Sequence, residues 1–237
     1  MKNLDLVKSS ILINDEKLER LNDKNEKFKL GIVGGTFDPI HNAHLAMVEF
    51  VRTKFNLDFV LFIPSGTPPH KMSISTDKHD RYNMVLLATA SNEYFAVSDY
   101  EVKAEKRSYT VDTLKDMKKI YSLSDIYFIT GADAICTIEE WKDARGILES
   151  ATFIATTRPG IGLLRAQETI EKLNKKYNAN IISVYVPSLD ISSTYIRDQL
   201  LDGKSVKYLI PSCVEEYIYQ NCIYKNETKK HEQLRKL

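Results

Sequence analysis

Short apolar runs alternate with helical segments along almost the whole chain, and this alternation restricts the possible folds more than any other feature of the sequence. The apolar runs of strand length occupy residues 30–34, 59–64, 126–131, 152–156 and 182–186. Uninterrupted runs of this kind are typical of strands buried on both faces, as in a parallel sheet. Residues 95–102 alternate between apolar and polar instead, which predicts a half-exposed or edge strand.

The segments between these runs have the character of helices. We expect helices at about residues 43–55, 79–91, 109–121, 163–177, 192–202 and 211–222, where apolar side chains recur at helical spacing or capping residues stand at the ends. Strand–helix alternation with right-handed crossovers predicts a single doubly wound, Rossmann-like α/β domain around a mainly parallel sheet. Ligands of such folds bind beyond the carboxyl ends of the strands, at the switch point.

The two ends of the chain differ from this pattern. Residues 1–28 are polar and rich in Lys, Asn and Glu, and they could form a short amphipathic helix or a loose arm. Residues 225–237 are mostly charged. We therefore divide the chain into an extension at 1–28, a domain at 29–224 and a tail at 225–237, and we expect both ends to be solvated.

Charge and cysteine content exclude several classes of protein. The 33 basic and 32 acidic side chains give a formal net charge of +1, so no bulk charge attracts a nucleic acid or a membrane. Three widely spaced cysteines without a CxxC pair argue against a disulfide framework. The charged opening of the chain does not have the apolar core of a signal peptide. We expect a cytoplasmic protein without nucleic-acid or membrane partners, and a homo-oligomer stays open.

The strongest local signal is GGTFDPIHNAH, residues 34–44, directly after the first strand. Gly34 and Gly35 permit a tight turn, and the next helix begins near His41, where its unpaired N–H groups form a natural phosphate site. His41 and His44 would share one face of the first helical turn. A structural turn or a zinc site are the alternatives, although no third zinc ligand stands nearby. The P-loop and GxGxxG patterns are absent.

A second candidate element is ISSTYIR, residues 191–197, which again follows a strand and opens a helix. Ser193 and Thr194 would place hydroxyl and N–H groups at the helix start, and the planar fork of Arg197 could hold a phosphate. A plain serine N-cap beside a surface arginine explains the same residues equally well.

Together, GGTFDPIHNAH and ISSTYIR resemble the HxGH nucleotidyltransferase superfamily, and the finer pattern is similar to the bacterial type of nicotinate-nucleotide adenylyltransferase. The supporting segments are IPSGTPPHK, RSYTVDTL, GADA, TRPG and VKYLIPSCVEEYIYQNCIY, which follow one another in the family's order between residues 30 and 224. The chain departs from the superfamily pattern at Ala43, where the motif has glycine.

The resemblance implies a reaction of NAD biosynthesis. Mg²⁺-ATP and nicotinate mononucleotide would give nicotinate adenine dinucleotide and pyrophosphate by direct in-line attack, without a covalent enzyme intermediate. Mg²⁺ would be carried mainly by the ATP phosphates, with no metal site on the protein. The alternatives are a related transferase that uses nicotinamide mononucleotide or phosphopantetheine as acceptor, and a nucleotide-binding sensor without turnover.

The resemblance also implies roles for individual residues. His41, His44 and Arg197 would be catalytic. ATP would be bound by Gly34, Gly35, Thr36, Phe37, Gly131, Asp133, Arg158, Ser193 and Thr194, and nicotinate mononucleotide by Lys71, Thr110, Trp141 and Lys142. From the residues alone, Asp133 could instead cap a helix, Trp141 could be a core residue and Lys71 an ordinary loop lysine.

Overall fold

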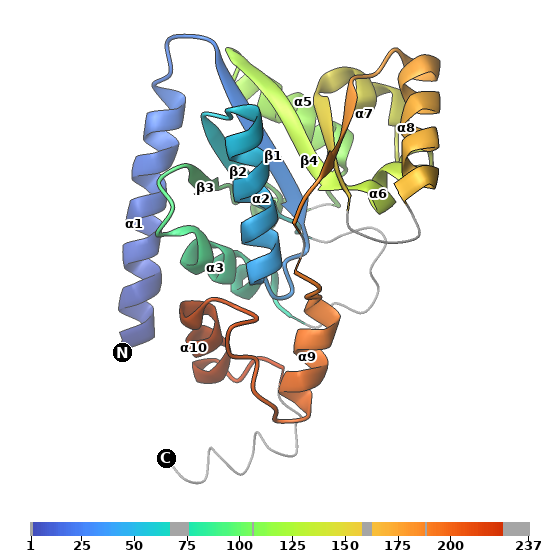
Figure 1. The fold of residues 1–237 in the computed structure, drawn as a ribbon. Helices are drawn as coiled ribbons and strands as arrows, with labels where there is room; N and C mark the ends of the chain where they lie inside the picture. The colour runs from blue at the N-terminus through green and yellow to red at the C-terminus, as the bar shows by residue number, and fades with distance from the viewer. Residues whose placement is uncertain (1, 67–75, 106, 158–162, 188, 225–237) are drawn as a thin grey trace.

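Six parallel strands form one sheet in the order β3-β2-β1-β4-β5-β6 (Figure 1). The computed structural model describes residues 2–66, 76–105, 107–157, 163–187 and 189–224. The strands are β1 (Phe28–Gly35), β2 (Phe59–Pro64), β3 (Phe95–Val97), β4 (Ser124–Gly131), β5 (Thr152–Thr157) and β6 (Ile181–Tyr185). This strand order is the doubly wound arrangement of Rossmann-type sheets, which confirms the predicted fold class.

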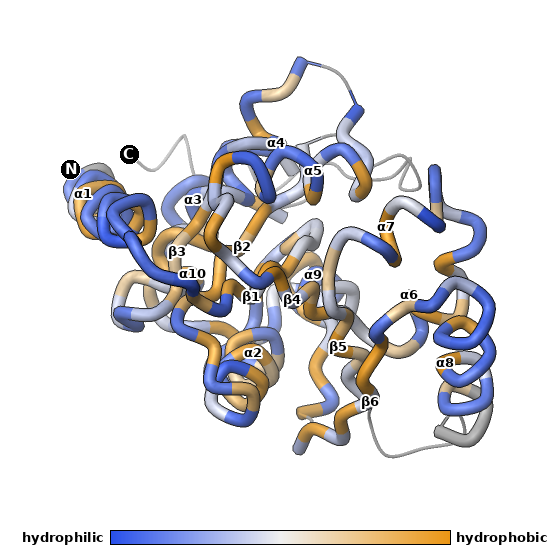
Figure 2. Tube along the Cα trace, turned by 90° about the horizontal axis from the view of Figure 1, so that it is seen from above, coloured by the Kyte–Doolittle hydropathy of each residue, from blue (hydrophilic) through white to orange (hydrophobic). Residues whose placement is uncertain are grey.

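Helices cover both faces of the sheet, and Figure 2 shows α2 and α5 on opposite sides of it. Apolar side chains of α2, α3, α9 and α10 join one core cluster, and those of α5, α7 and α8 join the other. No helix in the described ranges is both long and apolar enough to cross a membrane. The helices are α1 (Lys2–Asn22), α2 (Asn42–Phe55), α3 (Lys78–Thr89), α4 (Tyr100–Lys103), α5 (Thr110–Ile120), α6 (Ala132–Cys136), the 3-10 helix η1 (Ile138–Glu140), α7 (Ala144–Ser150), α8 (Leu163–Tyr177), α9 (Ser193–Leu201) and α10 (Ser212–Gln220).

The predicted edge strand at 95–102 is placed correctly but is too long. Only Phe95–Val97 pairs with the sheet, and α4 follows at once. The Ser98 hydroxyl accepts the N–H of Tyr100 at 3.2 Å, which turns the chain out of the strand direction. The alternation of apolar and polar residues continues into this helical turn, and that is why the sequence pattern extended the strand.

The N-terminal segment forms the long helix α1, which lies along β3 and α3 (Figure 1). The expectation of a solvated end is therefore wrong for this helix, since Ser10, Asn14, Lys17 and Leu21 are buried. The Asn14 side chain pairs with both the N–H and the C=O of Val97, at 2.7 and 3.0 Å. α1 thus covers the open edge of β3, where unpaired backbone groups would otherwise face water.

The switch point of the sheet lies between β1 and β4. From β1 the chain winds outward to β2 and β3, then returns to β4 and winds the other way. β1 ends with Gly34 and Gly35, and β4 ends with Gly131. Both glycine-containing ends therefore meet at the carboxyl edge where a ligand is expected.

Candidate active site

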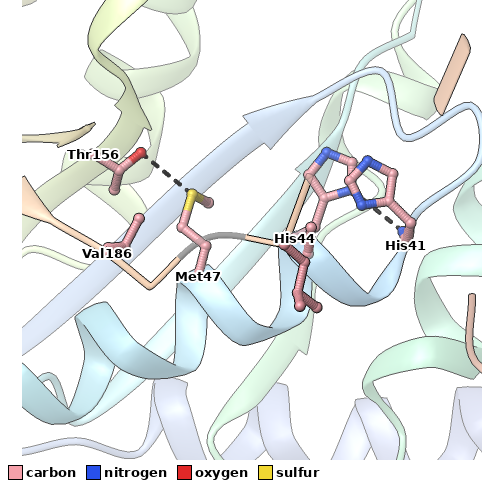
Figure 3. Close-up of a pocket in the computed structure, with 7 residues that line it drawn as sticks. His41, His44, Met47, Thr156 and Val186 are labelled. Carbon is pink, nitrogen blue, oxygen red and sulfur yellow. Dashed lines mark hydrogen bonds between the residues drawn. The ribbon is translucent and has the colours of Figure 1, made fainter. Parts of the chain in front are cut away.

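An open pocket lies at the carboxyl edge of the sheet, beside the first turn of α2 (Figure 3). Its position agrees with the ligand site expected of a doubly wound sheet. The residues that line it come from α2, β5 and the connection between β6 and α9, namely His41, Ala43, His44, Met47, Thr156, Val186 and Leu189.

The two histidines of the motif form one unit at the start of α2. Their rings stack with centroids 3.6 Å apart and planes 18° apart. His41 is the N-cap residue, and its backbone N–H donates to the ring of His44. For His44 the acceptor is Nδ1, 3.3 Å from the His41 amide nitrogen. A neutral ring that accepts at Nδ1 carries its proton on Nε2, so His44 holds a fixed N–H donor at a helix N-terminus.

The loop between β1 and α2 is held in a conformation that requires glycine at one position. Phe37 has a positive φ of 50° and is buried, and its ring covers Gly35. A Cβ on Gly35 would lie 2.8 Å from this ring, which is too close. A Cβ on Gly34 would meet nothing nearer than 3.9 Å, and Gly34 is exposed. The backbone at Gly34 is therefore accessible to a ligand, whereas Gly35 is needed for packing.

The first turn of α9 docks directly on this loop. Arg197 Nη1 donates to the carbonyl of Asp38 at 2.8 Å, and Nη2 donates to the Thr194 hydroxyl at 3.3 Å. The Ser193 hydroxyl donates to the carbonyl of Pro39 at 2.9 Å. Ser193 and Arg197 thus fix the loop, a contact that the sequence did not reveal, and the other guanidinium N–H groups can still reach an anion.

The end of β4 is open above its last residue. A Cβ on Gly131 would meet no atom within 4 Å. Gly131 is the N-cap of α6, and Asp133 lies exposed in the first turn of this helix. Because the cap position belongs to Gly131, Asp133 does not cap α6, and it stands exposed in the helical turn that follows β4.

The residues proposed for the pyridine substrate gather between α5 and η1. Lys142 Nζ lies 3.0 Å from an Asp112 carboxylate oxygen and 4.2 Å from the centre of the Tyr109 ring, so it reaches the first turn of α5, where Thr110 stands. Trp141 is half-buried and packs against the core, and its backbone N–H donates to Ile138 within η1. This N–H therefore already has a partner, which leaves the ring of Trp141 as the group able to meet a substrate.

Two predicted residues, Lys71 and Arg158, lie outside the described residues. Within the described ranges, no three His, Cys, Asp or Glu side chains stand close enough together to hold a metal ion.

The sequence interpretation missed the apolar side of the pocket. Met47 follows His44 at helical spacing, so the pattern of α2 could have indicated it. The Thr156 hydroxyl lies 3.3 Å from the Met47 sulfur (Figure 3). The same hydroxyl donates to the carbonyl of Thr130 at 3.1 Å. Val186 and Leu189 stand just before the ISSTYIR segment, but nothing in their local pattern indicates a pocket.

The sequence interpretation also missed the groups behind the loop. Asp38 is buried, and the Tyr224 hydroxyl donates to its carboxylate at 2.5 Å. Burial, together with the neighbouring Asp38 carboxylate, raises the pKa of Tyr224. The C-terminal part of the domain therefore supports the loop that carries the histidines.

Comparisons with known proteins agree with this geometry. The model of the cytidylyltransferase-like family matches residues 32–199, from β1 to α9. Two similar proteins are named "Probable nicotinate-nucleotide adenylyltransferase". The one from Thermoanaerobacter sp. is 48% identical over 203 residues, and the one from Moorella thermoacetica is 48% identical over 199 residues. These matches cover 85% and 83% of this chain, and 96% and 92% of the respective relatives.

The fold is also similar to that of solved structures. Nicotinic acid mononucleotide adenylyltransferase from Plasmodium falciparum, complexed with NaAD, superposes with a TM-score of 0.68 at 24% identity. The superposition covers 83% of this chain and 97% of that one. The chain therefore belongs to the cytidylyltransferase-like family and, within it, to the nicotinate-nucleotide adenylyltransferases.

Proposed function

We propose that this chain transfers the adenylyl group of ATP to nicotinate mononucleotide, releasing pyrophosphate and forming nicotinate adenine dinucleotide. The observation that carries the reaction class is the stacked His41–His44 pair at the N-terminus of α2, beside an open pocket at the switch point. The choice of acceptor is supported by the relatives named above, at 48% identity.

The chemistry needs no nucleophilic side chain. An oxygen of the acceptor phosphate forms a bond to the α-phosphorus of ATP, and the bond from that phosphorus to the bridging oxygen of pyrophosphate breaks. Because an ionised phosphate is already nucleophilic, catalysis consists of positioning and charge stabilisation. Positioning alone can supply up to about 7–11 kcal/mol. Mg²⁺ enters as part of the substrate, held mainly by the ATP phosphates and water.

The donors of the loop and of α9 have complementary roles in this reaction. His41, His44 and the positive N-terminus of the α2 dipole hold the α-phosphate and stabilise the charge that grows on its oxygens. The remaining N–H groups of Arg197, with Thr194, bind the departing pyrophosphate. The exposed backbone at Gly34 and the open space above Gly131 admit the nucleotide closely.

The acceptor binds on the α5 side of the switch point. The ring of Trp141 stacks on the pyridine, and the α5 terminus at Thr110, with Lys142 beside it, recognises the nicotinate carboxylate. Lys142 would exchange its present partner, Asp112, for that carboxylate or bridge the two through its several N–H donors.

Pyrophosphate release by the purified chain tests the proposal. The assay contains Mg²⁺-ATP and one acceptor at a time, either nicotinate mononucleotide, nicotinamide mononucleotide or phosphopantetheine. We expect strong preference for the first, because a site that pairs a carboxylate rejects the amide by several kcal/mol. Preference for another acceptor would refute the Thr110–Trp141 assignment. ATP binding without release in all three reactions would favour a nucleotide sensor.

A further inference from the structure

Arg81 of α3 is the largest fully buried side chain in the described part of the protein, with only 1% of its surface exposed. A buried guanidinium is costly unless its N–H groups are hydrogen-bonded. Nη1 donates to the carbonyl of Thr36 and Nη2 to the carbonyl of Gly66, both at 2.8 Å. Nη1 also reaches the Ser65 hydroxyl at 3.4 Å. One cation therefore joins the loop after β1 to the end of β2.

The bond to Thr36 controls the direction of a peptide group. In a trans peptide the C=O of one residue and the N–H of the next point in opposite directions. When Arg81 holds the Thr36 carbonyl toward the core, the N–H of Phe37 must point to the other side of the loop. Asp38 and Pro39 also have their carbonyls held, by Arg197 and Ser193. The loop thus turns these three carbonyls toward protein donors.

This orientation matters for an anion site. A carbonyl oxygen that faced a phosphate would repel it, whereas an N–H attracts it. Phe37 has a positive φ of 50°, which costs about 1–2 kcal/mol in a residue with a side chain. Such a conformation persists only where the surroundings enforce it. Arg81 is placed to supply that constraint on the 36–37 peptide.

Gly66, which accepts the second hydrogen bond of Arg81, is itself held in place. The carboxylate of Glu101 accepts hydrogen bonds from the Gly66 amide and from the Thr113 hydroxyl, the latter at 2.7 Å. A Cβ on Gly66 would lie 2.1 Å from the carbonyl oxygen of Glu101, so only glycine fits. Burial raises the pKa of Glu101, and these hydrogen bonds oppose the rise. α4 thus fixes Gly66, and Gly66 in turn fixes the guanidinium.

We infer that Arg81 is a positioning residue for the proposed reaction: from behind the loop it keeps the Thr36–Phe37 peptide turned so that no carbonyl faces the ATP phosphates. The inference rests on the proposed function for its kinetic consequences. Its structural content is the orientation of one peptide group by one buried cation. Arg81 lies in KHDRYNM, a segment that looks like an ordinary exposed helix start.

Arg81→Met tests the inference, with Lys17→Met as a matched control. Lys17 is also a buried cation that donates to two backbone carbonyls, at 3.0 and 3.2 Å, but these belong to Thr89 and Ala90 at the opposite end of α3. We expect turnover to fall about 10–100-fold in Arg81→Met and the KM for ATP to rise, since small misplacements of catalytic groups have effects of this size. Lys17→Met should stay within about twofold of the wild type.

A conservative variant and a chemical rescue separate positioning from general damage. Arg81→Lys keeps the charge but not the planar fork, so it should keep the fold and still lose most of the turnover. Millimolar guanidinium should restore activity to Arg81→Ala and not change Lys17→Met. Equal turnover in folded Arg81→Met and Lys17→Met would overturn the inference. Should Arg81→Met fail to fold, wild-type turnover in Arg81→Lys would overturn it.

Binding of a non-hydrolysable ATP analogue, measured by calorimetry, keeps the two proposals distinguishable. A wild-type chain that binds the analogue but releases no pyrophosphate would refute the proposed function. The role of Arg81 would then be decided by the analogue Kd, which we expect to rise in Arg81→Met and to stay unchanged in Lys17→Met. An unchanged Kd in both variants, with equal turnover, would contradict the inference alone.

Discussion

Lys17 gives the stability of this protein a dependence on pH that can be worked out from the structure. Its ammonium is buried between α1 and the end of α3, and it donates to the carbonyls of Thr89 and Ala90. Burial, and secondarily the charge of Arg20, lowers the pKa of Lys17 from 10.5 to about 8. In the unfolded chain the same group keeps a pKa of about 10.4.

The sign of the effect follows from proton binding. Between about pH 8 and pH 10 the unfolded chain holds the Lys17 proton more tightly than the folded protein does, so folding becomes more favourable as the pH rises. One pKa unit corresponds to about 1.4 kcal/mol. With the two pKa values above, the free energy of unfolding should increase by about 1–2 kcal/mol from pH 8 to pH 9.5 because of this lysine.

Urea unfolding of wild type and Lys17→Met at pH 7, pH 8 and pH 9.5 measures the effect. Other groups titrate in this range, but both proteins share them, so the difference between the two profiles isolates Lys17. We expect the stability difference in favour of the methionine variant to shrink by about 1–2 kcal/mol over the upper interval. Parallel profiles would show that the Lys17 pKa is the same folded and unfolded, and would refute the reasoning.

Three further variants test separate parts of the account. Gly131→Ala should change the free energy of unfolding by less than about 1 kcal/mol but raise the KM for ATP, and an unchanged KM would remove Gly131 from the site. Gly35→Ala should lower the free energy of unfolding by about 1–3 kcal/mol, because the methyl group added at Gly35 meets the packed Phe37 ring. Trp141→Ala should raise the KM for nicotinate mononucleotide by the equivalent of about 1–3 kcal/mol, because the stacking of the Trp141 ring on the pyridine is lost. An unchanged KM would show that Trp141 is a core residue only. Asn14→Ala should lower the free energy of unfolding, measured by thermal unfolding, by about 1–3 kcal/mol. The KM values for ATP and for nicotinate mononucleotide should stay unchanged.

The sheet could be predicted from the sequence because most of its strands are short apolar runs that can be recognised from their own residues. β2 is apolar and buried at every position, and its predicted bounds match the structure. The strand ends then placed the glycine–histidine loop and the start of α9 at one edge, since parallel strands bring their carboxyl ends together. The meeting of Arg197 with the loop confirms that step.

The features that sequence reasoning missed depend on contacts between residues far apart in the chain. α1 is held by polar side chains, and Asn14 reaches Val97 across 83 positions, so hydrophobic periodicity could not reveal that it docks. Arg81 reaches Thr36 across 45 positions and lies among polar neighbours, which locally indicate a solvated surface. Short helices such as α6 have too few residues for a periodic pattern.

The turnover of His44→Ala, compared with its affinity for an ATP analogue, tests the central claim most directly. We expect kcat for pyrophosphate release to fall about 10²–10³-fold, as when a donor to a developing oxyanion is removed. The analogue Kd should change far less, because His41, Arg197 and Thr194 still bind the phosphates. Thermal unfolding of the same variant verifies that the protein still folds without the paired rings. Wild-type turnover in a folded His44→Ala would contradict the claim that this histidine stabilises the α-phosphate of the transferred adenylyl group.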